Sequence, residues 1–528
     1  MPDAVVIGAG PNGLVAANLL ADRGWDVVVL EAQPEPGGAV KSAELVEPGF
    51  VNDVFSAFYP LAVASPVLRS LDLAAHGLRW CRAPVALAHP AADGTCPVVS
   101  TDLDETAASL DAYAPGDGDA WRRLYGRWER IGGPLVASIL SPFPPVRGPA
   151  RLLGATRPSE LVELVRFLAL PVRRIGEEEF AAEPARRLLA GCALHADVFP
   201  ESPVGGLMGW LLAAIGQERG WPVPEGGAGR LTDALVSRLT SAGGKLQCST
   251  PVTGVVVRGG RAVAVRTAAG DEVDAGRAVV ADVAAPALYR GLVGEEHLPA
   301  RVVRGLDRFT WDHATVKVDW ALDGPIPWAA EAARRAGTVH LADSVDSLTV
   351  QATQLQLGLV PDPLFVIVGQ QGRADATRAP AGKEAAWAYA HVPQEVRGDA
   401  GGGGITGAWD RSDAEAVADR IEGAIERLAP GFRSLVRGRH VLTPRSLEAA
   451  NANLVGGATN SGTAQLHQQL VFRPVPGLGR AGTPVAGLFL ASASAHPGGG
   501  VHGACGANAA RAALAAERWR PRGPRRRR

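Results

Sequence analysis

The feature that most constrains this chain is the glycine-rich turn GAGPNG at residues 8–13. The apolar run at residues 4–7 is typical of a buried parallel strand, and residues 14–23 carry apolar side chains at helical spacing. Residues 26–30 predict a second strand, which ends at Glu31. A strand, a tight turn, a helix and a second strand in this order form the context that a dinucleotide-binding βαβ unit requires.

Each glycine of this motif has a separate physical task. Gly8 permits the tight turn, Gly10 lets the backbone approach a pyrophosphate, and Gly13 lets the helix pack closely on the strand. The helix start at Pro11 and Asn12 offers free N–H groups and a partial positive charge to phosphates. We therefore predict that all five of these residues contact the cofactor.

The acidic residue at the end of the second strand completes the motif. Glu31 lies 18 residues after Gly13. A carboxylate at this place can accept hydrogen bonds from both ribose hydroxyls, and its charge would repel a 2′-phosphate. Glu31 and its neighbour Ala32 are therefore predicted to contact the adenosine half of the cofactor.

Three further features favour FAD over NAD, which this motif alone does not separate. The pair Gly37 and Gly38, followed by Ala39, lets the backbone bend back along the cofactor, so that Lys41 could reach a phosphate. The α/β pattern returns only near residue 224, as it does in flavoproteins with inserted substrate domains. The third feature is a second glycine-rich loop, at residues 496–503, which leads into a predicted helix at residues 506–518.

The second loop offers both cofactor contacts and candidate proton carriers. Its N–H groups could face the N1/O2 edge of a flavin, where negative charge develops on reduction. His496 and His502 flank the loop, and either could relay a proton, although a helix N-terminus favours a neutral imidazole with a hydrogen-bonding role. The predicted contacts in the loop are Gly499, Gly500, Val501 and Gly503.

The composition excludes several functional classes. The 528 residues are 47% hydrophobic and 20% charged, which predicts a folded protein of two or three domains. The formal net charge of −1 gives no overall field for nucleic acid. No signal peptide is visible, and the longest apolar run is too short to span a bilayer, so we expect a cytoplasmic protein with at most peripheral membrane contact.

The cysteine pattern excludes further classes. None of the five cysteines is spaced as C-x-x-C, which argues against a disulfide framework and a structural zinc site. It also argues against a pyridine nucleotide–disulfide reductase, which needs a redox-active pair. We predict no metal site.

The order of the patterns predicts two interleaved domains. Residues 65–213 are predicted to be mostly helical, residues 314–320 and 364–369 to form strands, and residues 413–429 to form a helix. Residues 521–528, which end in four arginines, are expected to be a disordered basic tail. We assign residues 1–64, 224–295 and 440–520 to an FAD-binding domain, and residues 65–223 and 296–439 to a substrate or cap domain.

These motifs together resemble a known family. The stretch 5–41, the Pro48-Gly49-Phe50 turn that follows it, and the loop at residues 496–510 are similar to the phytoene desaturase-related FAD-dependent oxidoreductases. The branch that they resemble most is the phytoene dehydrogenase-like branch, also called pyridine nucleotide-disulfide oxidoreductase domain-containing protein 2. The two insertions, nearly half of the chain, match only in general character.

The resemblance implies an α/β fold like that of amine oxidases and phytoene desaturases, with a Rossmann-like FAD-binding domain interleaved with an α+β substrate domain. It also implies non-covalent FAD and hydride transfer from a C–H or C–N bond to flavin N5. By resemblance, Val252 lies where the family places backbone groups against the adenine. Family members often carry Arg near Lys41, and Lys keeps the charge without the fork geometry.

The expected activity is therefore that of an FAD-dependent dehydrogenase or desaturase acting on an apolar or mid-sized organic molecule. Three alternatives stay open: a flavin-dependent non-redox isomerase, an amine oxidase, and a non-catalytic protein that holds FAD for interaction. The electron acceptor is open among O2, a quinone and NAD(P). Asp53 and Phe58 could lie near the flavin or pack in the core, and Lys317 could take the place of the lysine that positions water in amine oxidases.

Overall fold

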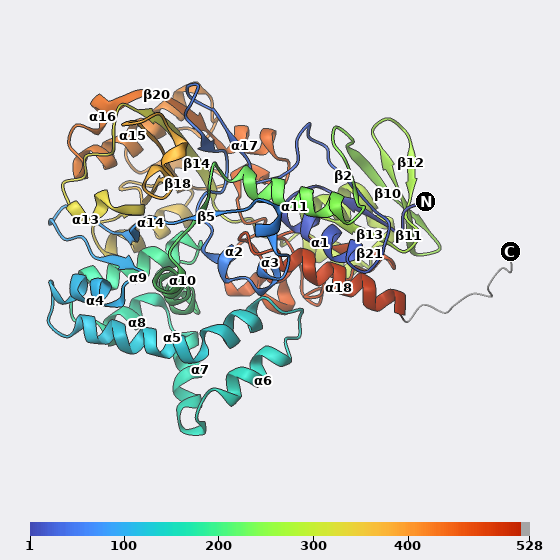
Figure 1. Cartoon of the computed structure of the whole chain (residues 1–528), viewed down its shortest axis with the longest axis horizontal. Helices are drawn as coiled ribbons and strands as arrows, with labels where there is room; N and C mark the ends of the chain where they lie inside the picture. The colour runs from blue at the N-terminus through green and yellow to red at the C-terminus, as the bar shows by residue number, and fades with distance from the viewer. Residues whose placement is uncertain (519–528) are drawn as a thin grey trace.

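The computed structural model describes residues 1–518, so the predicted tail at residues 521–528 lies outside the described part of the chain. The chain forms two lobes that lie side by side (Figure 1). One lobe is built on a five-stranded sheet and contains the N-terminus, and the other is built on a seven-stranded sheet.

The five-stranded sheet is parallel throughout and has the order β21-β13-β1-β2-β9. All residues of four of its strands are buried, as expected for a parallel sheet covered on both faces. This confirms the strands predicted around the glycine-rich turn and near the C-terminus. The strands are β1 (Ala4–Ile7), β2 (Val27–Leu30), β9 (Lys245–Gln247), β13 (Ala278–Ala281) and β21 (Leu488–Leu490).

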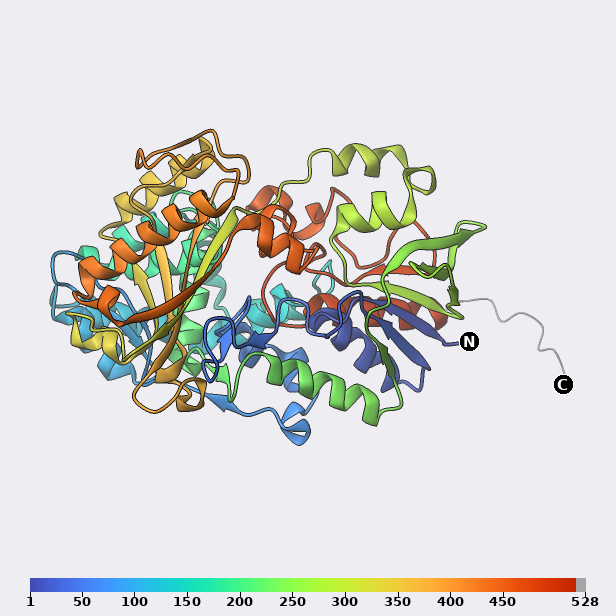
Figure 2. The same ribbon diagram turned by 90° about the horizontal axis from the view of Figure 1, so that it is seen from above.

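Different elements cover the two faces of this sheet because alternate residues of each strand point to opposite sides. Val6 and Val29 pack on helices α1 (Pro11–Ala21), α11 (Gly229–Ser241) and α18 (Ala504–Arg518). Val5 and Val28 pack under an antiparallel sheet and two helical segments, and Figure 2 shows that sheet beside the N-terminus. These elements are β10 (Val252–Arg258), β11 (Arg261–Thr267), β12 (Glu272–Asp274), η3 (Ala287–Val293) and α12 (Ala300–Leu306).

The seven-stranded sheet has the order β20-β14-β18-β17-β15-β6-β7 and is antiparallel except for the β15·β6 pair. Strands β6 and β7 lie in the segment predicted to be mostly helical, so that prediction was wrong there. Their short, fully buried runs lack the alternation that marks a half-buried strand, and β6 finds its partner far along the chain. The strands are β6 (Val85–Ala88), β7 (Val98–Ser100), β14 (Ala314–Leu322), β15 (Ala336–Leu341), β17 (Val366–Gln370), β18 (Glu384–Val392) and β20 (Val436–Leu442).

The two faces of the larger sheet differ in character. Val316 and Val318 face an apolar layer that includes α15 (Arg411–Leu428). The opposite face packs against helices α9 and α10 and against residues 52–59, which come from the other lobe. The helices of the inserted segment are α4 (Leu103–Asp111), α5 (Asp117–Ile139), α6 (Arg147–Gly154), α7 (Leu161–Ala169), α8 (Val172–Glu179), α9 (Glu183–His195) and α10 (Gly205–Arg219).

Short elements complete the fold. Strand β20 crosses the predicted domain boundary at residue 440, because it ends at Leu442 in the larger sheet. No helix among residues 1–518 is both long enough and apolar enough to cross a membrane. The remaining α-helices are α2 (Pro60–Ala64), α3 (Pro66–Arg69), α13 (Glu331–Arg334), α14 (Val345–Gln356), α16 (Phe432–Leu435) and α17 (Pro444–Ala450). The remaining strands are β3 (Ser42–Ala43), β4 (Asn52–Asp53), β5 (Trp80–Cys81), β8 (Val223–Pro224), β16 (Leu359–Val360) and β19 (Gly398–Asp399).

Candidate cofactor site

The glycine-rich turn has the geometry that its sequence predicts. Gly8 has a φ of +92°, and its N–H donates to Leu30 O at 2.8 Å, which fixes the turn to the end of β2. A Cβ on Gly13 would lie 2.2 Å from Gly8 O, so no side chain fits there. Helix α1 therefore starts directly against the end of β1, with its N-terminus open at Pro11 and Asn12.

Glu31 is buried and braces the turn from the second strand. Its Oε2 accepts from Ala9 N at 2.7 Å, and its Oε1 accepts from Gln33 N at 2.9 Å. Each oxygen keeps a second lone pair, which can accept from a ribose hydroxyl. Thr250 N donates to Glu31 O at 2.8 Å, so the chain that enters β10 at Val252 runs beside this carboxylate, while Ala32 is exposed.

The Gly37-Gly38 segment folds back on the turn. Gly37 N donates to Ala9 O at 2.9 Å, and a Cβ on Gly38 would lie 3.0 Å from Gly10 Cα. Ala39 O accepts from Ser56 Oγ at 2.6 Å, which ties this segment to residues 52–59. Lys41 follows on the half-buried edge and forms no ion pair with the described residues.

The C-terminal loop and helix α18 meet the N-terminal motif. Gly506 N donates to Asn12 Oδ1 at 3.4 Å, and a Cβ on Gly506 would lie only 2.0 Å from Asn12 O. A Cβ on Gly503 would lie 2.9 Å from Val15 Cγ2. The N-termini of α1 and α18 thus converge, and their partial positive charges add at one place.

The other loop glycines have separate neighbours. A Cβ on Gly499 would lie 2.3 Å from Asn460 Oδ1, whereas one on Gly500, at a φ of +101°, would lie 2.8 Å from Leu61 Cδ1. Val501, half-buried, packs against the core between the α1 and α18 helices. The loop backbone is therefore closely surrounded, and its role in flavin contact stays a prediction.

Both candidate histidines are uncharged parts of the loop. His502 Nδ1 accepts from Ala504 N at 3.0 Å and so caps α18. His496 Nε2 donates to Ser141 O at 3.0 Å. Burial lowers the pKa of each imidazole to about 4. This geometry favours the neutral hydrogen-bonding role over a proton relay, most clearly for His502.

Two residues that sequence reasoning missed organise the loop. Arg473 is fully buried and donates to the carbonyls of Ala493 and of residues 460–463. Burial lowers the pKa of this guanidinium to about 10, so it stays charged at neutral pH. Asp312 accepts from the N–H groups of Thr459, Asn460 and Gly462. Neither lies in a recognisable motif, because their partners are distant in sequence.

The mixed face of the larger sheet adjoins the cofactor lobe through residues 52–59. Phe58 packs on Trp387 with ring centroids 6.1 Å apart, and Trp387 stacks on Tyr389. Lys317, predicted as a possible amine-oxidase lysine, forms a buried ion pair with Asp319 on the same strand. Its ammonium is therefore neutralised by its own neighbour. Asp53 is likewise paired, with the fully buried Arg378.

Three histidines lie deeper along this face and carry no charge at neutral pH. His195 Nδ1 and His340 Nε2 are 2.9 Å apart and share a hydrogen bond, and the His89 ring meets that of His340 edge-on. Burial lowers the pKa of His195 to about 3 and holds the pKa values of His89 and His340 well below their usual range. The face therefore presents rings and a balanced ion pair, without net charge.

These histidines predict a loss of stability in acid. An unfolded histidine takes up a proton below about pH 6.5, whereas the buried rings do not, so stability is full above that pH and falls below it. Each histidine contributes up to about 1.4 kcal/mol per pH unit. Asp282 and Asp319, whose pKa values burial raises to about 7 and about 6, oppose this effect.

The measurement is the urea midpoint between pH 7.5 and 5.5. We expect the midpoint to fall in the wild type, and His340→Gln to reduce the dependence by about one proton. The exposed-side control His297→Asn should leave the dependence unchanged. Equal dependence in the wild type and His340→Gln would contradict the assignment.

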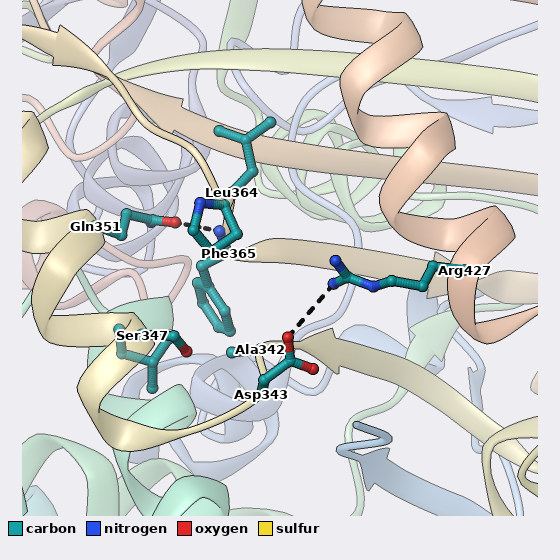
Figure 3. A pocket seen from close by; sticks show the side chains of 9 residues that line it. Ala342, Asp343, Ser347, Gln351, Leu364, Phe365 and Arg427 are labelled. Atoms are coloured by element: carbon teal, nitrogen blue, oxygen red, sulfur yellow. Dashed lines mark hydrogen bonds and ion pairs between the residues drawn. The ribbon is translucent and has the colours of Figure 1, made fainter. Parts of the chain in front are cut away.

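A pocket in the substrate lobe contains none of the predicted site residues. It has an empty volume of about 230 Å³ and lies between the end of β15, helix α14 and the start of β17 (Figure 3). Arg427 and Asp343 face each other across it at 3.7 Å, and Gln351 accepts from the backbone of Phe365. Both polar pairs are satisfied within the protein, so we assign this pocket no role in cofactor binding.

Comparison with known proteins supports the fold and the family. A family model described as an NAD(P)-binding Rossmann-like domain matches residues 6–71. Putrescine oxidase bound to putrescine superposes with a TM-score of 0.60 at 17% identity, over 97% of this chain and 98% of that one. The amine-oxidase-like fold predicted from the sequence is therefore confirmed.

Two relatives by sequence span nearly the whole chain. Phytoene desaturase (lycopene-forming) of Pseudescherichia vulneris is 25% identical over 98% of this chain and 99% of its own length. Pyridine nucleotide-disulfide oxidoreductase domain-containing protein 2 of Rattus norvegicus is 30% identical over 96% of this chain and 92% of its own. The chain therefore belongs to the family of pyridine nucleotide-disulfide oxidoreductase domain-containing protein 2, among the phytoene desaturase-like flavin-type oxidoreductases.

Proposed function

We propose that this protein is an FAD-dependent dehydrogenase or desaturase that binds FAD non-covalently and acts on a neutral, largely apolar organic molecule. The observation that carries the proposal is the convergence of the α1 and α18 N-termini at Asn12 and Gly506, beside the carboxylate of Glu31. Bound FAD would supply the hydride acceptor that this family uses.

The residues at the turn fit the cofactor. Of the first amides of α1, Leu14 N bonds back to Gly10 O and Gly13 N bonds to Asp282, whereas Asn12 N has no partner among the described residues. Asn12 N, together with Gly10 N before the helix, is thus free for a diphosphate oxygen. Glu31 would hold the ribose, and the close approach of Gly38 to Gly10 leaves room only for backbone beside the phosphates.

The sheet face next to residues 52–59 supports the choice of substrate class. Phe58, Trp387 and Tyr389 offer aromatic surface, and the nearby histidines are neutral. The charges on the face, Lys317 and Asp319, compensate each other. A neutral substrate with an extended apolar part suits such a face, because an unpaired ionic group would be buried without a partner.

The same observation weighs against an amine oxidase. A protonated amine needs a carboxylate or an open aromatic cage to replace its hydration. Asp319 already binds Lys317, and Trp387 and Tyr389 stack on each other at 5.9 Å. The isomerase and the FAD-holding interaction protein are separated from a dehydrogenase by experiment.

The test begins with the absorption spectrum of the purified protein. We expect flavin bands as isolated or after reconstitution with FAD, and release of the flavin into the supernatant on denaturation. Absence of the bands under both conditions would refute the proposal.

Substrate-dependent bleaching of these bands without oxygen would support the dehydrogenase, and reoxidation by O2, a quinone or NAD(P) would identify the acceptor. A product of unchanged mass would indicate the isomerase. Bound FAD that no reductant can reach would indicate the interaction protein.

A further inference from the structure

A buried carboxyl that no motif includes lies directly at the phosphate-binding turn. Asp282 follows the last residue of β13, and its side chain is buried. Its Oδ2 accepts from Gly13 N at 2.8 Å, and a Cβ on Gly10 would lie only 2.7 Å from the same oxygen. Asp282 therefore occupies one of the amides at the start of α1 that would otherwise face an anion.

The position of Asp282 is fixed by its backbone. Asn453 Nδ2 donates to Asp282 O at 3.1 Å, and Asn453 Oδ1 accepts from Ala284 N at 2.8 Å. A Cβ on Gly8 would lie 3.0 Å from Asp282 O, so the carbonyl packs on the turn itself. The carboxyl cannot withdraw from the turn without breaking these contacts.

The surroundings of Asp282 favour its neutral form. Burial raises the pKa of this carboxyl to about 7, the Gly13 N–H opposes the rise, and the negative charge of Glu31 adds to it. The thiol of Cys505, on α18, also lies within electrostatic range of Asp282, and burial raises the pKa of that thiol, which keeps it neutral. Without a ligand, Asp282 is thus divided between its two protonation states near neutral pH.

A diphosphate at the free amides of Gly10 and Asn12 would bring further negative charge next to this carboxyl. A like charge at short range disfavours ionisation of a carboxyl. We propose that Asp282 takes up a proton when the FAD diphosphate binds at this turn, so that cofactor affinity decreases as the pH rises. This inference rests on the proposed function, since it assumes that the turn binds FAD.

The sign of the effect follows from linkage. Below about pH 7, Asp282 is already protonated in the free protein, so affinity should not change with pH. Above that pH, binding must be accompanied by proton uptake, and the dissociation constant should increase by up to about tenfold per pH unit. The increase ends where the bound form also loses its proton.

The experiment measures FAD affinity of the cofactor-stripped full chain from pH 6 to pH 9 at constant ionic strength. We expect the dissociation constant to increase at least about tenfold between pH 7 and pH 9. Asp282→Asn keeps an oxygen that can accept from Gly13 N but cannot ionise, so its affinity should be independent of pH. The control Asp271→Asn, at an exposed turn of the same lobe, should behave as the wild type.

A second readout needs no variant. Calorimetric titration with FAD at pH 8, in two buffers of different ionisation enthalpy, should report uptake of up to about one proton per FAD bound. ADP, which has the diphosphate without the flavin ring, should show the same uptake.

The outcomes separate the two proposals. Tight FAD binding that is independent of pH and takes up no proton would overturn this inference alone, as would an unchanged dependence in Asp282→Asn. Failure of FAD and ADP to bind at any pH would overturn both this inference and the proposed function.

Discussion

Gly506→Ala is expected to give a protein that retains no FAD. The new Cβ would lie 2.0 Å from Asn12 O, and both sides of this contact are backbone, so neither can move aside without separating α18 from α1. Such overpacking costs about 3 kcal/mol, and the loss of the joint between the helix ends should weaken FAD binding at least about tenfold. The measurements are the flavin-to-protein ratio after purification and the urea midpoint.

A matched glycine elsewhere provides the control. Gly126 lies within helix α5, and a Cβ there would have no neighbour within 4 Å. Gly126→Ala should stabilise the protein by about 0.5–1 kcal/mol through helix propensity and leave FAD content unchanged. If Gly506→Ala and Gly126→Ala had the same flavin content, the two helix ends would not form the site.

Glu31→Ala is expected to have the second largest effect. Removal of the carboxylate leaves Ala9 N and Gln33 N without their acceptor, at a cost of about 2 kcal/mol in stability. It also removes the acceptor for the ribose hydroxyls, and the loss of charge-assisted hydrogen bonds should weaken FAD binding by about 100-fold. FAD affinity is measured by the quenching of flavin fluorescence.

Glu35→Ala is the control for this substitution, because Glu35 is exposed and lies four residues further along the same loop. It removes the same charge without disturbing the turn, so FAD affinity should stay within about twofold of the wild type. Equal weakening by both variants would mean that Glu31 acts only through its charge, and that the ribose contact is wrong. Glu31→Gln, which keeps one acceptor oxygen, should be intermediate.

The elements of the cofactor lobe were predictable because their signals are local. Residues 4–31 specify a strand, a turn, a helix and a strand through hydrophobic periodicity and through glycines that satisfy tight steric demands. The structure has these elements with boundaries that differ by a few residues. The family resemblance rests on the same local motifs, and the comparison with relatives confirms it.

The strands of the substrate lobe were harder to predict. Strand β6 has four buried residues and pairs in parallel with β15, which lies about 250 residues later in the chain. A short apolar run has the same appearance in a buried helix and in a buried strand, so only the partner decides between them. The aromatic and neutral character of the sheet face was missed for the same reason, since it combines side chains from several strands and from residues 52–59.

Asp282 carried a signal that could have been used, because it ends a buried strand just as Glu31 does. Its role depends on a neighbour 269 residues away, Gly13, and the sequence does not give that distance in space. By itself, the sequence determined the nucleotide-binding unit, because tight turns and parallel strands impose residue types at fixed spacing. Only the tertiary structure decided which distant groups meet that unit, namely Gly506, Asp282 and the loop held by Arg473, because their contacts depend on chain packing and leave no periodic pattern.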